Sequence, residues 1–257
     1  MLTQEEMNRL VPERLAMIEA EHGVKTLCAV ESGSRAWGFA SPDSDFDVRF
    51  IYIRPQEDYL RLHGYRDVIE TPIDDTWDVS GWDLQKALRL LHKSNPSLFE
   101  WMASGIRYVD TGFEARLAPL LSMYFEQKAG MAHYYHMARN NMRMFLKGET
   151  VKPKKYFYML RPVLACFWIR DNDAPPPMLY DRLVEAQMPP SLRAENARLL
   201  DIKMNLPEGE EIPHVRAVDD FLNAAMAEVE AYLHSLPDNK PKDWTPLEDF
   251  FLAELRK

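Results

Sequence analysis

The chain has 257 residues, of which 46% are hydrophobic and 28% are charged, enough for a sizeable core in one large or two smaller domains. Its formal net charge of −9 at pH 7 argues against a broadly basic surface for nucleic acid, although a local basic patch can coexist with an acidic total. No apolar run reaches the roughly eighteen residues that a membrane-spanning helix needs, which excludes an integral membrane protein of that kind.

The cysteines and the first residues bear on the cellular compartment in which the protein works. Cys28 and Cys166 lie in apolar runs without the paired spacing of a zinc site, so we expect buried thiols and no disulfide framework. Residues 1–6 have neither a basic leader nor the apolar centre of a signal peptide. We therefore expect a cytoplasmic location.

The first part of the chain alternates between helical and strand patterns. Apolar residues at helical spacing predict a helix over 3–21, closed by Gly23. Short apolar or β-branched runs predict strands at 27–31, 45–53, 67–70 and 76–80. Pro55 opens a loop with one helical turn between the second and third strands. These elements predict a small mixed sheet with helices.

The rest of the chain is predominantly helical. Apolar residues at i, i+3, i+4 and i+7 predict a helix over 84–91, and Asn95-Pro96 precedes a shorter one. Further helices are predicted at 114–146, as one long or two shorter helices, and at 154–169, 180–186, 191–204 and 215–236. The predicted fold class is α/β, with a small mixed-sheet domain over 1–110 and a helical domain over 111–257.

A turn suited to phosphate follows the first strand. Gly33 lets the backbone turn tightly and approach a ligand closely, and Ser34 stands at the start of a short helix. Backbone N–H groups and the positive end of a helix dipole gather at such a turn, so a triphosphate is expected there, with the Ser34 hydroxyl as an added donor. Arg35 follows directly, where its guanidinium can meet phosphate.

Two acidic residues enter the second predicted strand. Because side chains alternate along a strand, Asp45 and Asp47 are expected on one face. Two half-buried carboxylates repel unless a cation lies between them, and Mg²⁺ commonly takes one or two carboxylates plus substrate phosphates. Arg49 continues the same face and is expected to pair with these acids. Turn chemistry alone explains Ser-Gly-Ser and Pro-Asp-Ser-Asp, but it does not explain Asp47 within an apolar strand.

The motif Gly33-Ser34 followed by Asp45-x-Asp47 resembles the signature of the DNA polymerase β-like nucleotidyltransferase superfamily. The longer segments 31–38 and 41–49, with their Arg-Ala-aromatic-Gly insert, resemble the bacterial nucleotidyltransferases associated with RNA repair. Segments 88–101 and 154–162 are also similar to that family.

This resemblance implies a two-metal transfer of a nucleoside monophosphate from an NTP to an acceptor hydroxyl, using Mg²⁺ or Mn²⁺. Asp45 and Asp47 match the first two metal ligands, and a third carboxylate is implied on a neighbouring strand. Asp78 is our choice, because it lies in a short β-favouring run. Its neighbours Asp74 and Asp75 stay open, whereas Asp83 precedes an amphipathic run and is expected to cap a helix.

The helical domain supplies further candidates for binding the triphosphate. Lys154, Lys155 and Arg161 occupy one predicted helix, where a basic face is possible, although lysines at a helix start are also typical of a solvated end. His133 and His136 are three residues apart, but no matching acid stands nearby, so packing is expected in place of a metal site.

The function predicted from the sequence is metal-dependent nucleotidyl transfer, with an RNA end as the acceptor that the resemblance suggests. Two alternatives stay open. One is transfer of AMP to a protein or small molecule. The other is a regulatory module that binds NTP without turnover, which predicts that no third acid lies near Asp45 and Asp47.

Overall fold

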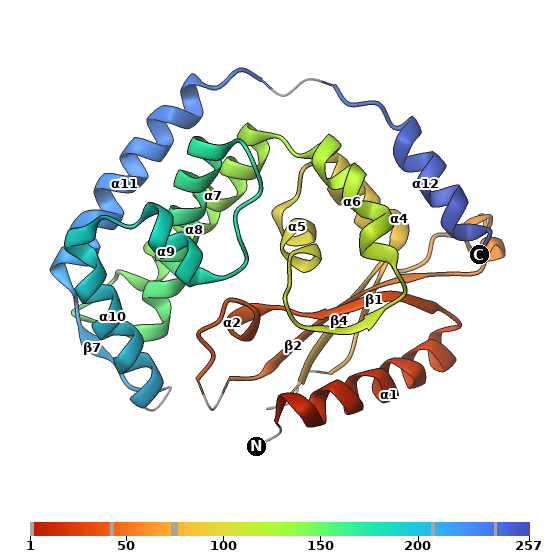
Figure 1. Cartoon of the computed structure of the whole chain (residues 1–257), viewed down its shortest axis with the longest axis horizontal. Helices are drawn as coiled ribbons and strands as arrows, with labels where there is room; N and C mark the ends of the chain where they lie inside the picture. Colours follow the sequence, from red (N-terminus) through yellow and green to blue (C-terminus); the bar gives the residue numbers. More distant parts are fainter. Residues whose placement is uncertain (1–2, 42–43, 73–76, 207–208, 239–240) are drawn as a thin grey trace. The chain divides into compact units, whose positions relative to one another are not determined.

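The computed structural model describes residues 3–41, 44–72, 77–206, 209–238 and 241–257 (Figure 1). Contacts divide the chain into two compact units. Unit 1 consists of Met1–Ala36, Ser44–Tyr124 and Pro241–Lys257, and unit 2 of Trp37–Asp43 and Phe125–Lys240. The boundary expected near residue 110 falls inside unit 1, which continues to Tyr124. The division into domains 1–110 and 111–257 stays a prediction.

Unit 1 is built on a five-stranded mixed sheet with the order β3-β4-β2-β1-β5. The strands are β1 Lys25–Glu31, β2 Phe46–Ile53, β3 Val68–Glu70, β4 Trp77–Asp83 and β5 Arg107–Asp110. Only the described pairing of β2 with β4 is parallel, and the other three pairings are antiparallel. The mixed sheet predicted from the sequence is confirmed.

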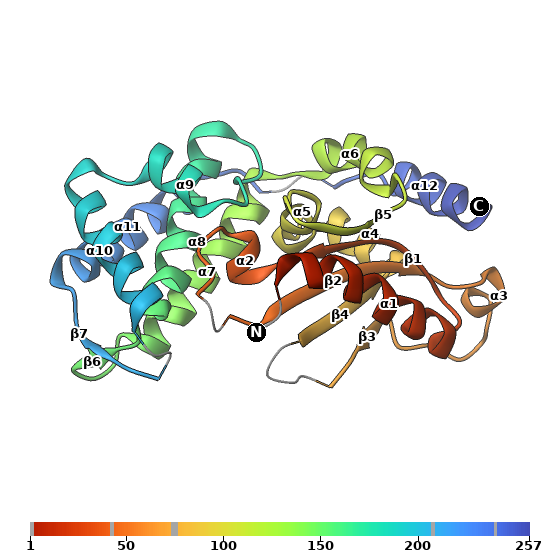
Figure 2. The ribbon, with the colours of Figure 1, turned by 60° about the horizontal axis from the view of Figure 1, so that its bottom comes forward.

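Helices cover both faces of this sheet (Figures 1 and 2). Helix α1 (Gln4–His22) buries Met7, Val11, Leu15 and Ile18 in the cluster that includes the apolar side chains of β2. It begins at a Thr3 capping box and ends at Gly23, whose φ of 62° suits glycine, as predicted. Helices α4 (Leu84–His92), α5 (Pro96–Met102) and α6 (Phe113–Tyr124) pack on the opposite face.

Short elements connect the strands of unit 1. Helix α2 (Gly33–Ala36) follows β1, and α3 (Gln56–Tyr59) provides the helical turn predicted after Pro55. Asp83 caps α4 by accepting a hydrogen bond from the backbone N–H of Gln85 at 2.8 Å, which confirms its predicted capping role. The sequence patterns missed strand β5 and helix α12 (Thr245–Leu255), which packs against α4.

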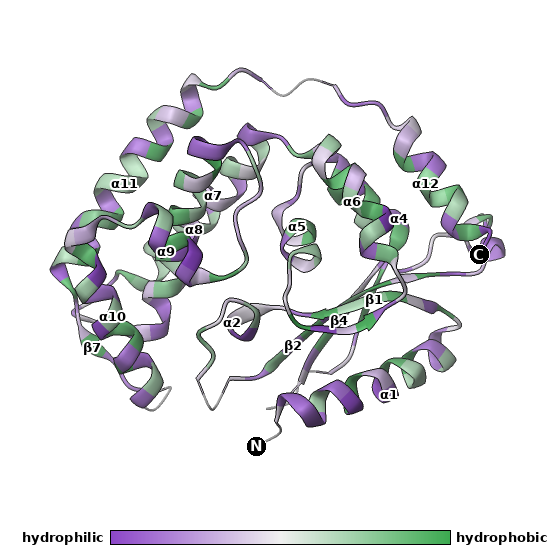
Figure 3. Ribbon diagram, in the orientation of Figure 1, coloured by the Kyte–Doolittle hydropathy of each residue, from purple (hydrophilic) through white to green (hydrophobic). Residues whose placement is uncertain are grey.

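Unit 2 is helical, and α8 forms its centre. Its helices are α7 (Gln127–Phe145), α8 (Pro153–Asn172), α9 (Tyr180–Gln187), α10 (Pro190–Asn205) and α11 (Arg216–Ser235), with the short strands β6 (Thr150–Val151) and β7 (Ile212–Pro213). Helix α8 is contacted by α7, α9, α10 and α11. Figure 3 shows hydrophilic and hydrophobic residues alternating along α11, which agrees with its one buried face. The predicted helical segment 114–146 consists of two helices, α6 in unit 1 and α7 in unit 2.

The segment Trp37–Asp43 packs within unit 2, although it is flanked in sequence by elements of unit 1. Phe39 is buried in the helical core, with its ring centroid 5.2 Å from that of Phe157 and 5.3 Å from that of Tyr180. The Phe39 carbonyl accepts a hydrogen bond from Lys203 Nζ at 2.7 Å. Phe39 of this segment therefore contributes to the hydrophobic core of unit 2.

None of the helices in the described parts of the chain combines the length and hydrophobicity needed to cross a membrane.

Candidate nucleotidyltransferase site

The candidate site of unit 1 is centred on two neighbouring carboxylates. Asp47 on β2 and Asp78 on β4 are direct partners in the parallel register. Their side chains are 20% and 27% exposed, so both charges are largely withdrawn from water. The sequence identified both residues, and the sheet places them side by side.

Arg49 joins the two carboxylates. Its Nη2 donates to Asp47 Oδ1 at 3.0 Å and to Asp78 Oδ2 at 2.7 Å. Its Nη1 donates to the backbone carbonyls of Val48 at 3.1 Å and Asp78 at 2.8 Å. Arg49 was predicted to pair with Asp45 and Asp47; the structure pairs it with Asp47 and, across the neighbouring strand, with Asp78.

Asp45 has a different setting from the other two acids. It lies one residue before β2, and it is exposed. Within the part of the chain that the structure describes, no group of three histidine, cysteine, aspartate or glutamate side chains has metal-binding spacing. Asp74 and Asp75, the other acids weighed as third ligand, lie outside the described residues. The structure therefore joins Asp47 to Asp78 more closely than either to Asp45.

The turn at Gly33 is built against Asp47. Gly33 has a φ of 56°, a left-handed conformation that favours glycine. A Cβ atom placed on Gly33 would lie 1.9 Å from Asp47 Oδ2, which no real contact permits. The Ser32 N–H also donates to the Asp47 carbonyl at 2.8 Å. Glycine is thus required here because the turn touches the carboxylate, and Ser34 follows on α2.

Glu31 supports Asp47 from the end of β1, and sequence reasoning gave it no role. Its carboxylate is fully buried and accepts hydrogen bonds from the Asp47 N–H at 2.8 Å and from the Tyr108 hydroxyl. Burial raises the pKa of Glu31 to about 7, against the lowering effect of these two hydrogen bonds. An acid at the end of an otherwise apolar strand was the available signal.

The same physical effects act on Asp47. Burial raises its pKa to about 6, Arg49 lowers it, and the charges of Asp45 and Asp78 raise it further. Asp47 is therefore an acid whose ionised form depends on a nearby positive charge. Such a group is a frequent feature of functional sites.

Arg35 binds the chain that leads into β2. Its guanidinium donates to the carbonyls of Ser44 at 2.6 Å and Asp45 at 3.1 Å, and it lies 3.7 Å from the ring centroid of Phe46. These contacts fix the approach to Asp45. A role in phosphate binding stays a prediction for this side chain.

The other predicted nucleotide-binding residues lie on α8 of unit 2. Lys155 Nζ lies 4.2 Å from the ring centroid of Phe145, and burial, aided by the charges of Lys154 and Lys152, lowers its pKa. Arg161 is only 2% exposed, with its guanidinium 4.5 Å from the ring centroid of Trp37. The first turn of α8 is thus half-buried, unlike a freely solvated helix end.

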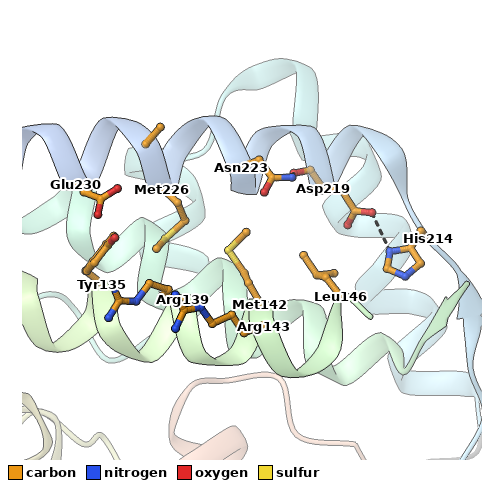
Figure 4. A pocket seen from close by; sticks show the side chains of 11 residues that line it. Tyr135, Arg139, Met142, Arg143, Leu146, His214, Asp219, Asn223, Met226 and Glu230 are labelled. Carbon is orange, nitrogen blue, oxygen red and sulfur yellow. Dashed lines mark hydrogen bonds and ion pairs between the residues drawn. The ribbon is translucent and has the colours of Figure 1, made fainter. Parts of the chain in front are cut away.

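Unit 2 also carries a groove of about 580 Å³ between α7 and α11 (Figure 4). Arg139 and Arg143 on α7 lie opposite Asp219 and Glu230 on α11. Asp219 contacts His214 Nδ1 at 2.9 Å and also accepts the Tyr156 hydroxyl at 3.0 Å. None of the residues predicted for the nucleotide site lines this groove, and its acidic wall is tied to the packing of α11.

Comparisons with known proteins identify the family of this chain. The chain is 44% identical over 243 residues to the uncharacterized protein YcgL of Bacillus subtilis (strain 168), covering 93% of this chain and 92% of that protein. A solved nucleotidyltransferase-like protein from Exiguobacterium sibiricum shares 14% identity at a TM-score of 0.30, over 86% of this chain and 73% of that one. Residues 7–253 match the model of the RlaP family, described as an RNA repair pathway DNA polymerase beta family. The chain belongs to this RNA repair pathway DNA polymerase beta family.

Proposed function

We propose that this protein transfers a nucleoside monophosphate from an NTP to an acceptor hydroxyl, using Asp47 and Asp78 to hold a divalent cation. The observation that carries the proposal is the pair of carboxylates on adjacent parallel strands, with the Gly33 turn in contact with one of them. Phosphate, cation and carboxylate would meet in one small region, as a phosphoryl-transfer site requires.

The residues fit a hard divalent cation. Asp47 and Asp78 offer oxygen ligands, which Mg²⁺ and Mn²⁺ prefer. Arg49 engages Asp47 Oδ1 and Asp78 Oδ2, while Asp47 Oδ2 lies on the side of the Gly33 turn. When bound, the ion would supply positive charge for the phosphates and lower the pKa of the acceptor hydroxyl.

The other residues have proposed roles that follow from their places in the fold. Asp45, which is exposed one residue before β2, is proposed as a further ligand of a two-metal centre. Gly33, Ser34 and Arg35 are proposed to receive the triphosphate, because they form the turn that lies against Asp47. On α8, we propose Lys154, Lys155 and Arg161 as further phosphate contacts.

The proposed acceptor is an RNA end, and the support for it is the RNA repair pathway in the description of the family. An NTP is the proposed donor, and a cytoplasmic location is proposed with it. The net charge of −9 predicts that any RNA contact is local, with a binding surface limited to basic residues.

The proposal is tested by incubating the protein with each α-labelled NTP and Mg²⁺, either with a mixed RNA pool or alone. Label on RNA with the wild-type protein supports polymerase-like transfer. Label on the protein itself would support the alternative of protein nucleotidylation, and binding of NTP without transfer would support the sensing module. Asp238→Asn serves as a control for Asp47→Asn, because Asp238 is fully exposed on its side chain.

A further inference from the structure

The arrangement of charge around Asp47 and Asp78 assigns a specific role to Arg49. Residues opposite each other on neighbouring strands stand within reach of direct interaction, and like charges in that position destabilise a sheet. Burial strengthens the repulsion, since water screens the two carboxylates poorly. The parallel pairing of β2 and β4 is therefore costly at Asp47 and Asp78 unless a positive charge lies between the two acids.

Arg49 supplies that charge from the same face of β2, two residues beyond Asp47. One nitrogen, Nη2, contacts both carboxylates, at 3.0 Å for Asp47 and 2.7 Å for Asp78. The Arg49 side chain is itself only 18% exposed. A guanidinium in this place neutralises one of the two negative charges and holds the oxygens in a fixed direction.

The other nitrogen is anchored to the backbone. Nη1 donates to the carbonyls of Val48 and Asp78, neither of which belongs to a carboxylate. These two hydrogen bonds hold the guanidinium beside the two acids independently of its contacts with the carboxylate oxygens. A cation that approaches the pair consequently meets a positive charge that is held in place.

We propose that Arg49 is the built-in counter-ion of the Asp47/Asp78 pair and that a divalent cation binds the pair in competition with this guanidinium. The inference rests on the proposed function, which places such a cation at the two carboxylates. It predicts that Arg49 stabilises the metal-free protein and weakens its affinity for metal.

The test uses the full chain with Mn²⁺ alone as the probe, measured by isothermal titration calorimetry after removal of metal with a chelator. Arg49→Gln removes the positive charge and keeps a polar side chain, and Arg9→Gln is the matched control, because Arg9 is 65% exposed and pairs with Glu13 on the surface. We expect Mn²⁺ to bind Arg49→Gln at least ~10-fold more tightly than wild type, since a like charge close to the ion is lost. Arg9→Gln should match wild type.

Thermal unfolding gives a second readout. In chelator, Arg49→Gln should melt below wild type, and Mn²⁺ should raise its melting temperature by more than it raises that of wild type. If Arg49→Gln does not fold, Arg49→Lys is measured in its place, because it keeps the charge but loses the fork that contacts both acids. Mn²⁺ should bind Arg49→Lys more tightly than wild type, because one ammonium cannot contact both acids, but the gain should be smaller than for Arg49→Gln, because the positive charge stays.

The outcomes separate this inference from the proposed function. Equal or weaker Mn²⁺ binding by a folded Arg49 variant, with binding lost in Asp47→Asn, overturns the counter-ion role and leaves the metal site intact. Absence of Mn²⁺ binding to wild type and to the Arg49 variants contradicts both. Tighter Mn²⁺ binding by the Arg49 variant, with Arg9→Gln equal to wild type, supports the competition between Arg49 and the cation.

Discussion

Gly33 and Asp47 determine each other's conformation. The carboxylate of Asp47 occupies the space that a side chain on residue 33 would need, and the backbone at Gly33 is left-handed. The turn therefore guides the direction of the Asp47 carboxylate.

Replacing Gly33 by alanine should displace the Asp47 carboxylate. We expect Gly33→Ala to reduce nucleotidyl transfer at least ~100-fold, because misplacement of a reacting group by about 1 Å has effects of that size. The control is Gly23→Ala, which has a similar φ of 62° but nothing within 4 Å of the added Cβ. Gly23→Ala should lose about 1–2 kcal/mol of unfolding free energy to backbone strain, and Gly33→Ala should lose more because its Cβ also clashes with Asp47, as measured by urea denaturation. Equal transfer by the two variants would contradict the account.

Glu31 is predicted to matter through the backbone of Asp47. Glu31→Ala leaves the Asp47 N–H and the Tyr108 hydroxyl without their acceptor, so we expect a loss of about 2–5 kcal/mol in unfolding free energy. Glu31→Gln keeps an oxygen for the Asp47 N–H and should lose less than half as much. Chemical denaturation of the two variants checks this. If they were equally unstable, the hydrogen bond to Asp47 would not be the cause.

Sequence reasoning could propose the site residues whose pattern is local. The two-residue period of a strand predicted the face of Asp47 and Arg49, and β-favouring neighbours led to Asp78 as the third acid. An acid at the end of an apolar strand was a signal for Glu31, but its partner could not be predicted, because that partner is the backbone of a residue sixteen positions away. The double contact of Arg49 depends likewise on the register of β2 with β4, which no single strand encodes.

Besides its packing against α4, α12 is tied to α6 by one buried acid, Glu254. Glu254 receives two hydrogen bonds from Arg116, at 2.8 and 2.9 Å, and one from Lys257 at 2.6 Å. Burial acts to raise the pKa of Glu254, but these hydrogen bonds outweigh it, so the pKa lies below its usual value of 4.5. The carboxylate is thus more favourable in the folded chain than in the unfolded one.

The pH dependence of this contact follows from the sign of the shift. A lowered pKa contributes stability above the unfolded pKa of about 4.5, and that stability is lost as the pH falls below it. Glu254→Gln should cost about 1–3 kcal/mol at pH 7 and much less at pH 3, measured by hydrogen exchange of α12 amides. Glu248→Gln, an exposed change on the same helix, should have little effect at either pH. An equal cost at both pH values would rule out the ionised contact.

Elements with strong periodicity were predictable and weaker ones were not. Helices α1, α4 and α8 carry clear apolar spacing or capping signals, and the structure confirms them. Strand β5 has four residues at the sheet edge, with an exposed-buried pattern too short to distinguish from a loop. Helix α12 has its buried positions set by the packing against unit 1, so its pattern was weak on its own.

At the scale of the whole molecule, the compact units are not continuous in sequence. Unit 2 includes the segment Trp37–Asp43, and unit 1 includes the last helix. A prediction that reads the chain in order divides it at one point, because it has no signal for a segment that leaves one unit and returns. Phe39 illustrates the physical reason: its partners Phe157 and Tyr180 lie more than a hundred residues away.

If Asp47 and Asp78 together hold the cation, nucleotidyl transfer requires both carboxylates. The decisive experiment is single-turnover transfer from α-labelled NTP to RNA by wild type, Asp47→Asn and Asp78→Asn under identical conditions. Both variants should keep the far-ultraviolet circular dichroism spectrum of wild type and lose transfer, because each removes a charged oxygen ligand at nearly constant volume. Wild-type transfer retained by either folded variant would contradict the claim.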